Sequence, residues 1–372
     1  MVRTMSSFKV SFWELHRNKM IGIALIAVIV ISMGVSFVAI LQQERQTKVQ
    51  VFHAGSLTVP FSSFANVWIA VHPEYMIDNE PYGSSAAIRQ ITELGRRADL
   101  LGSADYTLIY SMMMNVTIPG SGMKYADWYI IFAINEMGIA YVSENNPPYL
   151  GNLTSGSNKW FEILNRTDVT FGRADPWQDP CGYRTLMVWG LADDYYNLSG
   201  TADPQEINQS MYFKDPLSGY EGPGKTKVKA KEVDLISTLE TEEIDYLFIY
   251  KSVAVQHNLG YLELDDHIDL SNYTLESTYN NVTVHRISPL VPGESSSDIE
   301  GKAIQYGVTI PNNAPNPEGA VEYLKFILGY PGMMQELGQP PYYPAYASNV
   351  SKLPEELQPY CVDYKAAEPY EK

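Results

Sequence analysis

Four short polar turns, each leading into a helical pattern, carry the residues best suited to chemistry. They contain Ser56 in HAGSL, Ser84 in YGSSA, Asp179 in DPCGY and Glu232 in KEVDL. Ser and Asp are favoured N-caps, and a helix start offers free N–H donors with a partial positive charge. Helix starts that converge can form an anion site without Arg or Lys, although capping alone explains each residue taken singly. We expect Ser56, Ser84 and Asp179 at N-caps and Glu232 at the opening of its helix.

Sequence signatures of enzymes are weak. The chain contains no GxSxG, HExxH, P-loop or GxGxxG motif, and its six His residues show no metal-ligand spacing. His53 and Ser56 lie three residues apart on one turn, which is a poor placement for a base and a nucleophile. Two Cys residues are too few for a disulfide scaffold or a four-cysteine zinc site.

The elements that must position these turns alternate along the chain. Apolar runs typical of strands occur between segments with apolar residues at helical spacing, which predicts an α/β class. The expected strands cover residues 49–53, 98–104, 129–141 (a pair), 246–250 and 306–310. The expected helices cover residues 57–71, 87–94, 186–191, 233–239 and 318–328.

Length and charge bound the class of function. The chain has 372 residues, which is enough for two domains with their own cores. It carries 26 Lys and Arg against 43 Asp and Glu, for a formal net charge of −17. This charge argues against general binding to nucleic acid or to an anionic membrane surface.

The N-terminal region predicts an anchor. Residues 20–41 (MIGIALIAVIVISMGVSFVAIL) carry no charge, and about 20 apolar residues are needed to span a bilayer. The positively charged flank, residues 1–19, would stay in the cytoplasm, and the chain after the polar tether at 42–48 would face outside. A cleaved signal peptide is the alternative. A lipid anchor on a cysteine just after the run is excluded, because the only cysteines are Cys181 and Cys361.

Glycosylation triplets support an outside location. The pattern N-x-[ST] is expected about two or three times by chance in this composition. It occurs at Asn115, Asn152, Asn165, Asn197, Asn208, Asn272, Asn281 and Asn349. The excess indicates surface glycosylation, although clustering of Asn, Ser and Thr in loops is an alternative explanation.

Six blocks of the chain resemble the archaeal-type tungstate/molybdate-binding proteins of ABC importers. The resemblance runs from about Val49 to Tyr346, and the blocks are long and occur in family order. They are VFHAGSL, YGSSAAIRQITELGRRADLLGSADYTLI, KYADWYIIFAINEMGIAY, DPCGYR, EEIDYLFIYKSVAVQHNLGYLEL and YGVTIPNNAPNPEGAVEYLKFIL.

The resemblance implies a type II periplasmic-binding-protein fold. Two α/β lobes would enclose a ligand cleft and be joined by two crossover strands, near residues 127–133 and 250–254. The implied parts are lobe one (49–127 and 252–346), lobe two (128–251) and a C-terminal tail (347–372).

The resemblance also implies the residues that donate to the oxyanion. Ser56 and Ser84 match positions that hydrogen-bond it, and Tyr250 matches a tyrosine that contacts it. The backbone N–H groups at Ser85 and Cys181 are further candidates. Whether Ser84 or Ser85 supplies the hydroxyl contact stays open, because family members commonly have GSV or GSG there.

Asp179 and Glu232 match two carboxylates that, in this family, reach the tungsten or molybdenum atom itself. A carboxylate would repel an oxyanion, unless the metal centre accepts two more oxygens and becomes roughly octahedral. Sulfate and phosphate cannot expand in this way, so the pair would select against them.

The implied function is an extracytoplasmic solute-binding component that captures tungstate or molybdate and delivers it to the permease and ATPase of an importer. It would be a monomer and need no cofactor, and it would not be an enzyme. One alternative is a binding protein for sulfate or phosphate. Another is a secreted hydrolase or transferase with Asp179 and Glu232 as its acid and base. A disulfide between Cys181 and Cys361 is a further open question.

Overall fold

The computed structural model describes residues 28–33, 46–164, 166–196, 226–286 and 297–364. The chain divides into two compact units, residues 1–47 with 72–76 and residues 48–71 with 77–372. Within the first unit the backbone N–H of Thr47 donates to the Glu74 carbonyl at 2.7 Å. The second unit contains all of the predicted site residues.

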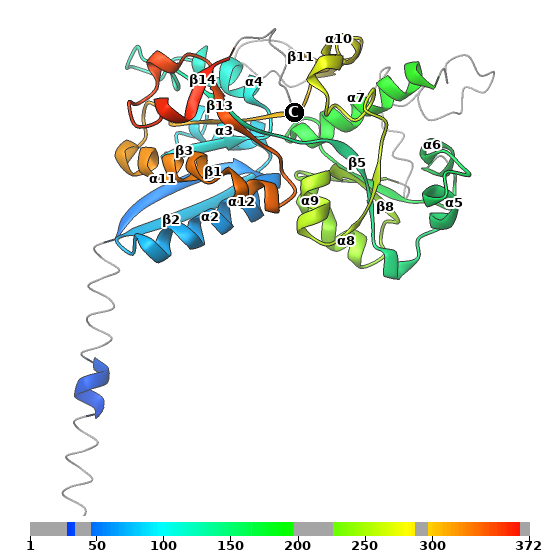
Figure 1. The fold of residues 1–372 in the computed structure, drawn as a ribbon, viewed down its shortest axis with the longest axis horizontal. Coiled ribbons are helices and arrows are strands. Elements are labelled where there is room, and N and C mark those ends of the chain that lie inside the picture. Colours follow the sequence, from blue (N-terminus) through cyan, green and yellow to red (C-terminus); the bar gives the residue numbers. More distant parts are fainter. Residues whose placement is uncertain (1–27, 34–45, 165, 197–225, 287–296, 365–372) are drawn as a thin grey trace, which may run out of the picture. The chain divides into compact units, whose positions relative to one another are not determined.

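The strands form two larger sheets and one hairpin in the described part of the chain (Figure 1). Their bounds are β1 (Thr47–Ala54), β2 (Tyr75–Tyr82), β3 (Leu100–Ser103), β4 (Ile130–Ile134), β5 (Met137–Tyr141), β6 (Phe171–Ala174), β7 (Thr226–Lys229), β8 (Tyr246–Tyr250), β9 (Gly260–Glu263), β10 (Thr283–Arg286), β11 (Ser297–Glu300), β12 (Gln305–Thr309), β13 (Pro341–Ala347) and β14 (Cys361–Asp363).

The helices lie between these strands. The α-helices are α2 (Thr58–Val71), α3 (Ser84–Thr92), α4 (Tyr106–Ile109), α5 (Leu150–Thr154), α6 (Trp160–Leu164), α7 (Pro180–Tyr195), α8 (Ile236–Glu240), α9 (Lys251–Gln256), α10 (Glu276–Tyr279), α11 (Pro317–Gly329) and α12 (Pro331–Glu336). The other helical turns are η1 (Gly55–Leu57), η2 (Tyr110–Met114), η3 (Ser143–Asn145), η5 (Glu232–Leu235), η6 (Tyr273–Leu275), η7 (Val350–Lys352) and η8 (Gln358–Tyr360).

The larger sheet has seven strands in the order β14-β13-β4-β12-β3-β1-β2. β1 and β3 run parallel, whereas β12 is antiparallel to both β3 and β4. Every residue of β3 and β12 is buried, because both strands lie inside the sheet with a neighbour on either edge. β14 pairs parallel with β13 beside it (Figure 1), so residues 361–363 extend this sheet.

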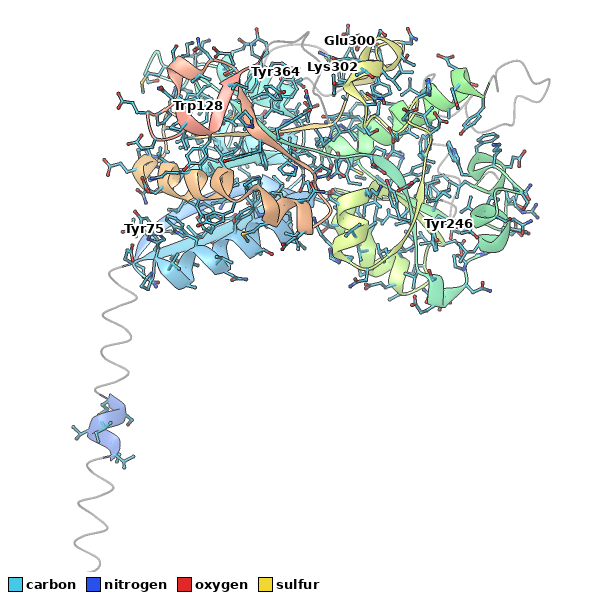
Figure 2. All side chains as sticks on the ribbon, in the orientation of Figure 1. Tyr75, Trp128, Tyr246, Glu300, Lys302 and Tyr364 are labelled. Atoms are coloured by element: carbon cyan, nitrogen blue, oxygen red, sulfur yellow. The ribbon has the colours of Figure 1, made fainter. Side chains whose placement is uncertain are left out.

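The smaller sheet has five strands in the order β7-β6-β8-β5-β9. β8 is buried along its whole length and lies parallel to β6 and antiparallel to β5. Tyr246 of β8, labelled in Figure 2, donates from its hydroxyl to the Pro148 carbonyl at 2.6 Å. Trp189 of α7 packs edge-on against Phe248 of β8, with ring centroids 5.2 Å apart.

Helix starts follow the signals in the sequence. Asn316 caps α11 by accepting from the Gly319 N–H at 3.0 Å, and Pro317 occupies the first turn. α7 is buried almost throughout, from Pro180 to Ala192, because apolar residues surround it on every face. The strands and helices expected from the sequence are all present, with their ends shifted by a few residues.

The strands change sheet between Ile134 and Met137, since β4 belongs to the larger sheet and β5 to the smaller one. The sequence prediction has this passage a few residues earlier, near 127–133. β9 pairs with β5 in the smaller sheet, although residues 260–263 fall within the range predicted for lobe one.

The predicted anchor lies mostly outside the described residues. Residues 28–33 form a helical segment, and the rest of 20–41 is not described. Nowhere in the described ranges does a helix reach the length and apolar character that crossing a bilayer requires.

Four of the glycosylation triplets present an exposed asparagine, at Asn115, Asn152, Asn281 and Asn349. Asn272 is half-buried and caps η6 through its side chain. Asn165, Asn197 and Asn208 lie outside the described residues.

Cys181 and Cys361 are both free and buried, so the structure contains no disulfide between them. Cys181 is the second residue of α7, and its thiol faces the Phe248 carbonyl at 3.8 Å. Cys361 begins β14.

Candidate functional site

Asp179 and Glu232 open two helical turns, as the sequence predicts. Asp179 is the N-cap of α7, and its Oδ1 accepts from the Cys181 N–H at 2.8 Å. Glu232 is the first residue of η5, after Lys231 at the N-cap. Both carboxylates are almost completely buried, with 2% and 1% exposure.

The two serines lie one or two residues inside their helices rather than at the caps. Ala54 caps η1, so the predicted N-cap position of Ser56 is wrong, and Gly83 caps α3, so that of Ser84 is wrong too. The capping residues, Ala54 and Gly83, have extended backbone angles, and each helix has therefore begun by the time the chain reaches the serine. The serine hydroxyls are thus free to bond elsewhere.

Two glycines show how closely the four turns approach one another. A β-carbon on Gly55 would lie 3.3 Å from Glu232 Oε2, so η1 and η5 are in contact. A β-carbon on Gly83 would lie 3.2 Å from the α-carbon of Asp179, so the start of α3 touches the start of α7. The structure therefore brings the four predicted turns together in pairs.

The carboxylates of Asp179 and Glu232 are close enough to be electrostatically coupled. Asp179 Oδ2 and both carboxylate oxygens of Glu232 are buried without a hydrogen-bond donor in good geometry among the described residues. Burial raises the pKa of Asp179, and burial together with the charge of Asp179 raises the pKa of Glu232 well above its ordinary value. Two buried carboxyl groups side by side either share a proton or together bind a positively charged or electron-accepting atom.

A buried arginine, which the sequence analysis missed, lies beside the predicted ligand residues. Arg184 Nη1 donates to Tyr250 Oη at 2.9 Å and to the Ala104 carbonyl at 2.7 Å. Its Nη2 lies 3.8 Å from Asp105 Oδ2, and that carboxylate also accepts from the Tyr183 hydroxyl at 2.6 Å. Converging helix starts could bind an anion without any Arg or Lys. The structure nevertheless places one basic side chain, that of Arg184, beside the predicted site.

Ser84 and Ser56 each accept a hydrogen bond at the hydroxyl oxygen. The backbone N–H of Ala104 donates to Ser84 Oγ at 2.9 Å, and the Tyr306 hydroxyl donates to Ser56 Oγ at 2.9 Å. Tyr250 Oη likewise accepts from Arg184. A hydroxyl whose oxygen is already an acceptor keeps its proton for another partner, so all three groups can donate to an anion.

Two further polar groups are buried nearby. Ser85 Oγ has no hydrogen-bond partner in the described part of the chain, which keeps it a candidate beside Ser84. His53 is completely buried and its Nδ1 lies 2.8 Å from the Ala54 carbonyl, so the ring is neutral with its proton on Nδ1. Burial lowers the pKa of His53 to about 4.

A cavity of about 580 Å³ lies next to these residues. Asp105, Tyr183 and Arg184 line one side of it, and residues of β11 and Lys302 line another. Ser56, Ser84, Asp179, Glu232 and Tyr250 are not among its lining residues, and each is at most 2% exposed. The structure therefore represents an arrangement in which the predicted site is sealed from solvent.

Sequence signals for the missed residues differ. Arg184 belongs to the DPCGYR block and lies five residues after the N-cap Asp179. This nearness in the sequence is a signal that could have marked it as a site residue. Tyr306 lies 250 residues from Ser56, its hydrogen-bond partner, and no local pattern connects them.

Residues 49–332 match the protein family described as bacterial extracellular solute-binding protein. A relative from Petrotoga mobilis, an uncharacterized solute-binding protein, is 42% identical over 313 residues, which cover 84% of this chain and 89% of the relative. The molybdate/tungstate-binding protein WtpA of Thermococcus kodakarensis is 39% identical over 299 residues, which cover 78% of this chain and 80% of that protein.

Among solved structures, the periplasmic molybdate-binding protein of Azotobacter vinelandii is similar to 78% of this chain and 98% of its own. The TM-score is 0.50 and the sequence identity is 10%, so the likeness concerns the fold alone. That fold is the α/β periplasmic-binding-protein fold with mixed sheets.

Proposed function

The chain belongs to the family of bacterial extracellular solute-binding proteins, and within this family we propose that it captures tungstate or molybdate for an ABC importer. The permease and the ATPase subunit of that importer would be its partners, and the protein would act as a monomer without a cofactor. It performs no chemistry on its ligand. The relative in Thermococcus kodakarensis, named as a molybdate/tungstate-binding protein, supports the ligand class.

One observation carries the proposal, namely the buried pair of Asp179 and Glu232. A site for a simple tetrahedral anion would present donors only, because carboxylates repel negative charge. Here two carboxylates with unsatisfied oxygens face each other next to a set of hydroxyl donors. The hydroxyl groups can donate hydrogen bonds to the oxygens of an oxyanion. The carboxylate oxygens can bind its central atom, if that atom accepts further oxygen ligands.

Each group then has a distinct role. Ser56, Ser84 and Tyr250 would donate to the oxygens of the anion, with the helix start around Ser85 adding N–H donors. The Cys181 N–H, a further candidate from the sequence, already donates to Asp179 Oδ1. Asp179 and Glu232 would bind the tungsten or molybdenum atom and complete six oxygen ligands. Sulfur and phosphorus do not expand in this way, so sulfate and phosphate would face two uncompensated carboxylates.

Ligand capture would close two lobes, one built on each large sheet. In this proposal the passage at residues 135–136 bends, and the turns around Ser84 and Asp179 meet when the ligand is bound. The closed form would be the one presented to the permease. The close packing of Gly83 against Gln178 supports a closed state that is tight enough to exclude water.

The location outside the membrane also belongs to this proposal. Residues 20–41 would anchor the chain as a single span, with residues 1–19 in the cytoplasm and the solute-binding part outside. The exposed asparagines at 115, 152, 281 and 349 would then be accessible to glycosylation.

Calorimetric titration of residues 49–372 with tungstate, molybdate, sulfate and phosphate tests the ligand class. Tight binding of the first two alone is the expected result. Binding of sulfate or phosphate at comparable strength would assign the protein to another oxyanion. Absence of binding with all four would reject the proposal, provided that circular dichroism shows the protein to be folded.

A further inference from the structure

Ser56 lies at the end of a chain of hydrogen bonds that begins at two backbone N–H groups. Asn135 Oδ1 accepts from the backbone N–H groups of Glu136 (3.1 Å) and Ser252 (3.3 Å). The amide nitrogen of Asn135 therefore faces the other way, and it donates to Ser252 Oγ at 2.7 Å and to Tyr306 Oη at 3.1 Å. Tyr306 donates to Ser56 Oγ at 2.9 Å.

All members of this chain are buried, so water does not compete for their protons. Asn135 is 3% exposed, Ser56 is 1% exposed, and Tyr306 is fully buried. Burial raises the pKa of Tyr306 far above its ordinary value, which keeps the phenol protonated. Tyr306 has one proton and uses it on Ser56, so the hydroxyl proton of Ser56 is left to point to another acceptor.

The chain also connects the two large sheets. Asn135 lies where the polypeptide passes from β4 to β5, and Ser252 lies in α9, directly after β8 of the smaller sheet. Tyr306 belongs to β12 of the larger sheet. The chain of hydrogen bonds thus begins at Asn135, in the passage between the two sheets, and ends at Ser56 in the predicted ligand site.

We propose that Asn135 and Tyr306 are positioning residues that hold Ser56 as a hydrogen-bond donor to the bound oxyanion. This inference rests on the proposed function. A fully deprotonated tetraoxo dianion presents acceptors only, so a serine held as a donor matches it in every orientation of the anion. A serine without the two positioning residues would have to order its hydroxyl during binding, and that ordering would weaken the affinity.

Calorimetric titration with sodium tungstate tests this role in four proteins: wild type, Tyr306→Phe, Ser56→Ala and the double variant. Tyr306→Phe is expected to weaken binding about three- to tenfold, which is the range for one lost hydrogen bond. Added to Ser56→Ala, the same change is expected to cost less than about twofold, because the group that it positions is already gone. A merely structural role of Tyr306 would give the same loss in both backgrounds.

Tyr323→Phe is the matched control. The Tyr323 hydroxyl is also buried, and it donates to the Phe61 carbonyl at 3.1 Å, away from the site. Its removal is expected to lower the melting temperature of the ligand-free protein without changing tungstate affinity.

Asn135→Asp provides a second variant in case Tyr306→Phe does not fold. It keeps the oxygen that accepts from Glu136 and Ser252. It replaces the nitrogen that donates to Tyr306 and to Ser252 Oγ by an acceptor, which draws the Tyr306 proton away from Ser56. We expect the same loss of affinity. Unchanged affinity in both folded variants overturns the inference and leaves the proposed function intact, whereas a wild-type protein that does not bind tungstate overturns both.

Discussion

The α-carbon of Gly83 lies so close to Gln178 that a β-carbon on it would sit 2.2 Å from the Gln178 carbonyl oxygen and 2.7 Å from its carbonyl carbon. The carbonyl is backbone and cannot swing aside as a flexible side chain would. Gly83 caps α3 and Gln178 precedes the N-cap of α7, so this contact joins the two halves of the proposed site.

Gly83→Ala is therefore expected to prevent the close contact between the start of α3 and the residue before the N-cap of α7. If the two halves separate without ligand, the ligand-free protein can accommodate the added methyl group, while the liganded protein cannot. Tungstate affinity should fall at least tenfold, or about 1.4 kcal/mol, with little change in the melting temperature of the ligand-free protein. Gly332→Ala, where a β-carbon meets open space, is the control and should leave affinity unchanged. Equal affinities of both variants would show that the contact is not part of the bound state.

The double change Asp179→Ala with Glu232→Ala tests the role of the carboxylates. Without them, tungstate keeps its hydroxyl donors but loses the two ligands that only an expandable centre can use. The preference for tungstate over sulfate should therefore shrink toward equal affinity, with sulfate binding gained as tungstate binding is lost. Competition titration measures this ratio. The matched control removes two exposed carboxylates, Glu355 and Glu356, in the same way. Undiminished selectivity of the first variant would reject the proposed metal contacts.

Arg184→Met tests the buried arginine. The change removes donors to Tyr250 and Ala104 and leaves the buried carboxylate of Asp105 without its nearest cation. Loss of one partner of a buried ion pair destabilises a fold by roughly 3–5 kcal/mol, so urea unfolding should show a large decrease in stability. Tungstate affinity should fall as well, because Tyr250 loses the group that orients it. Arg166→Met, at an exposed arginine paired with Asp168, should change stability far less, because solvent screens exposed ion pairs.

His53 makes stability depend on pH in a predictable direction. Its pKa is lowered by burial to about 4 from an ordinary value of 6.5, so between these values the unfolded chain binds a proton that the folded chain does not. Stability from this group is complete above pH 6.5 and is lost as the pH falls toward 4. The full effect is at most roughly 3 kcal/mol.

The measurement is urea unfolding of wild type and His53→Asn at pH 7.5 and pH 5. Asn can still donate to the Ala54 carbonyl but does not titrate. Between pH 7.5 and pH 5 the wild type should therefore lose more stability than the variant does. Burial raises the pKa of Asp269 to about 7, so its contribution to stability rises as the pH falls. Both proteins contain Asp269, and the comparison between them cancels this contribution. A difference that does not change with pH would show that His53 is not buried as a neutral group.

Both cysteines should titrate as thiols. Unfolded, unreduced protein is expected to yield two thiols per chain with a thiol-specific reagent. In the folded protein Cys181 should be unreactive, because burial and the charges of Glu232 and Asp179 raise its pKa. Detection of no free thiol would restore the disulfide that the sequence analysis left open.

Local chemistry in the sequence determined the class of the protein and the elements of its site. Asp179 caps α7 as predicted, because an N-cap depends on a side chain and a backbone N–H only two residues apart. β8 (YLFIY), which is buried along its whole length, is recognisable because it reads as an uninterrupted apolar run. The family blocks predict a common site for Ser56, Ser84 and Glu232, which lie far apart in the sequence.

Only the tertiary structure decided how those residues are held. Tyr306 lies 171 residues from Asn135 and 250 from Ser56, and the hydrogen bonds among them exist only because β12 lies between β3 and β4. The same holds for Arg184, whose partners Ala104 and Tyr250 are 80 and 66 residues away. Helix starts and apolar periodicity are readable from neighbours along the chain, whereas the direction of a buried hydrogen bond and the coupling of two carboxylates depend on distances that only folding creates.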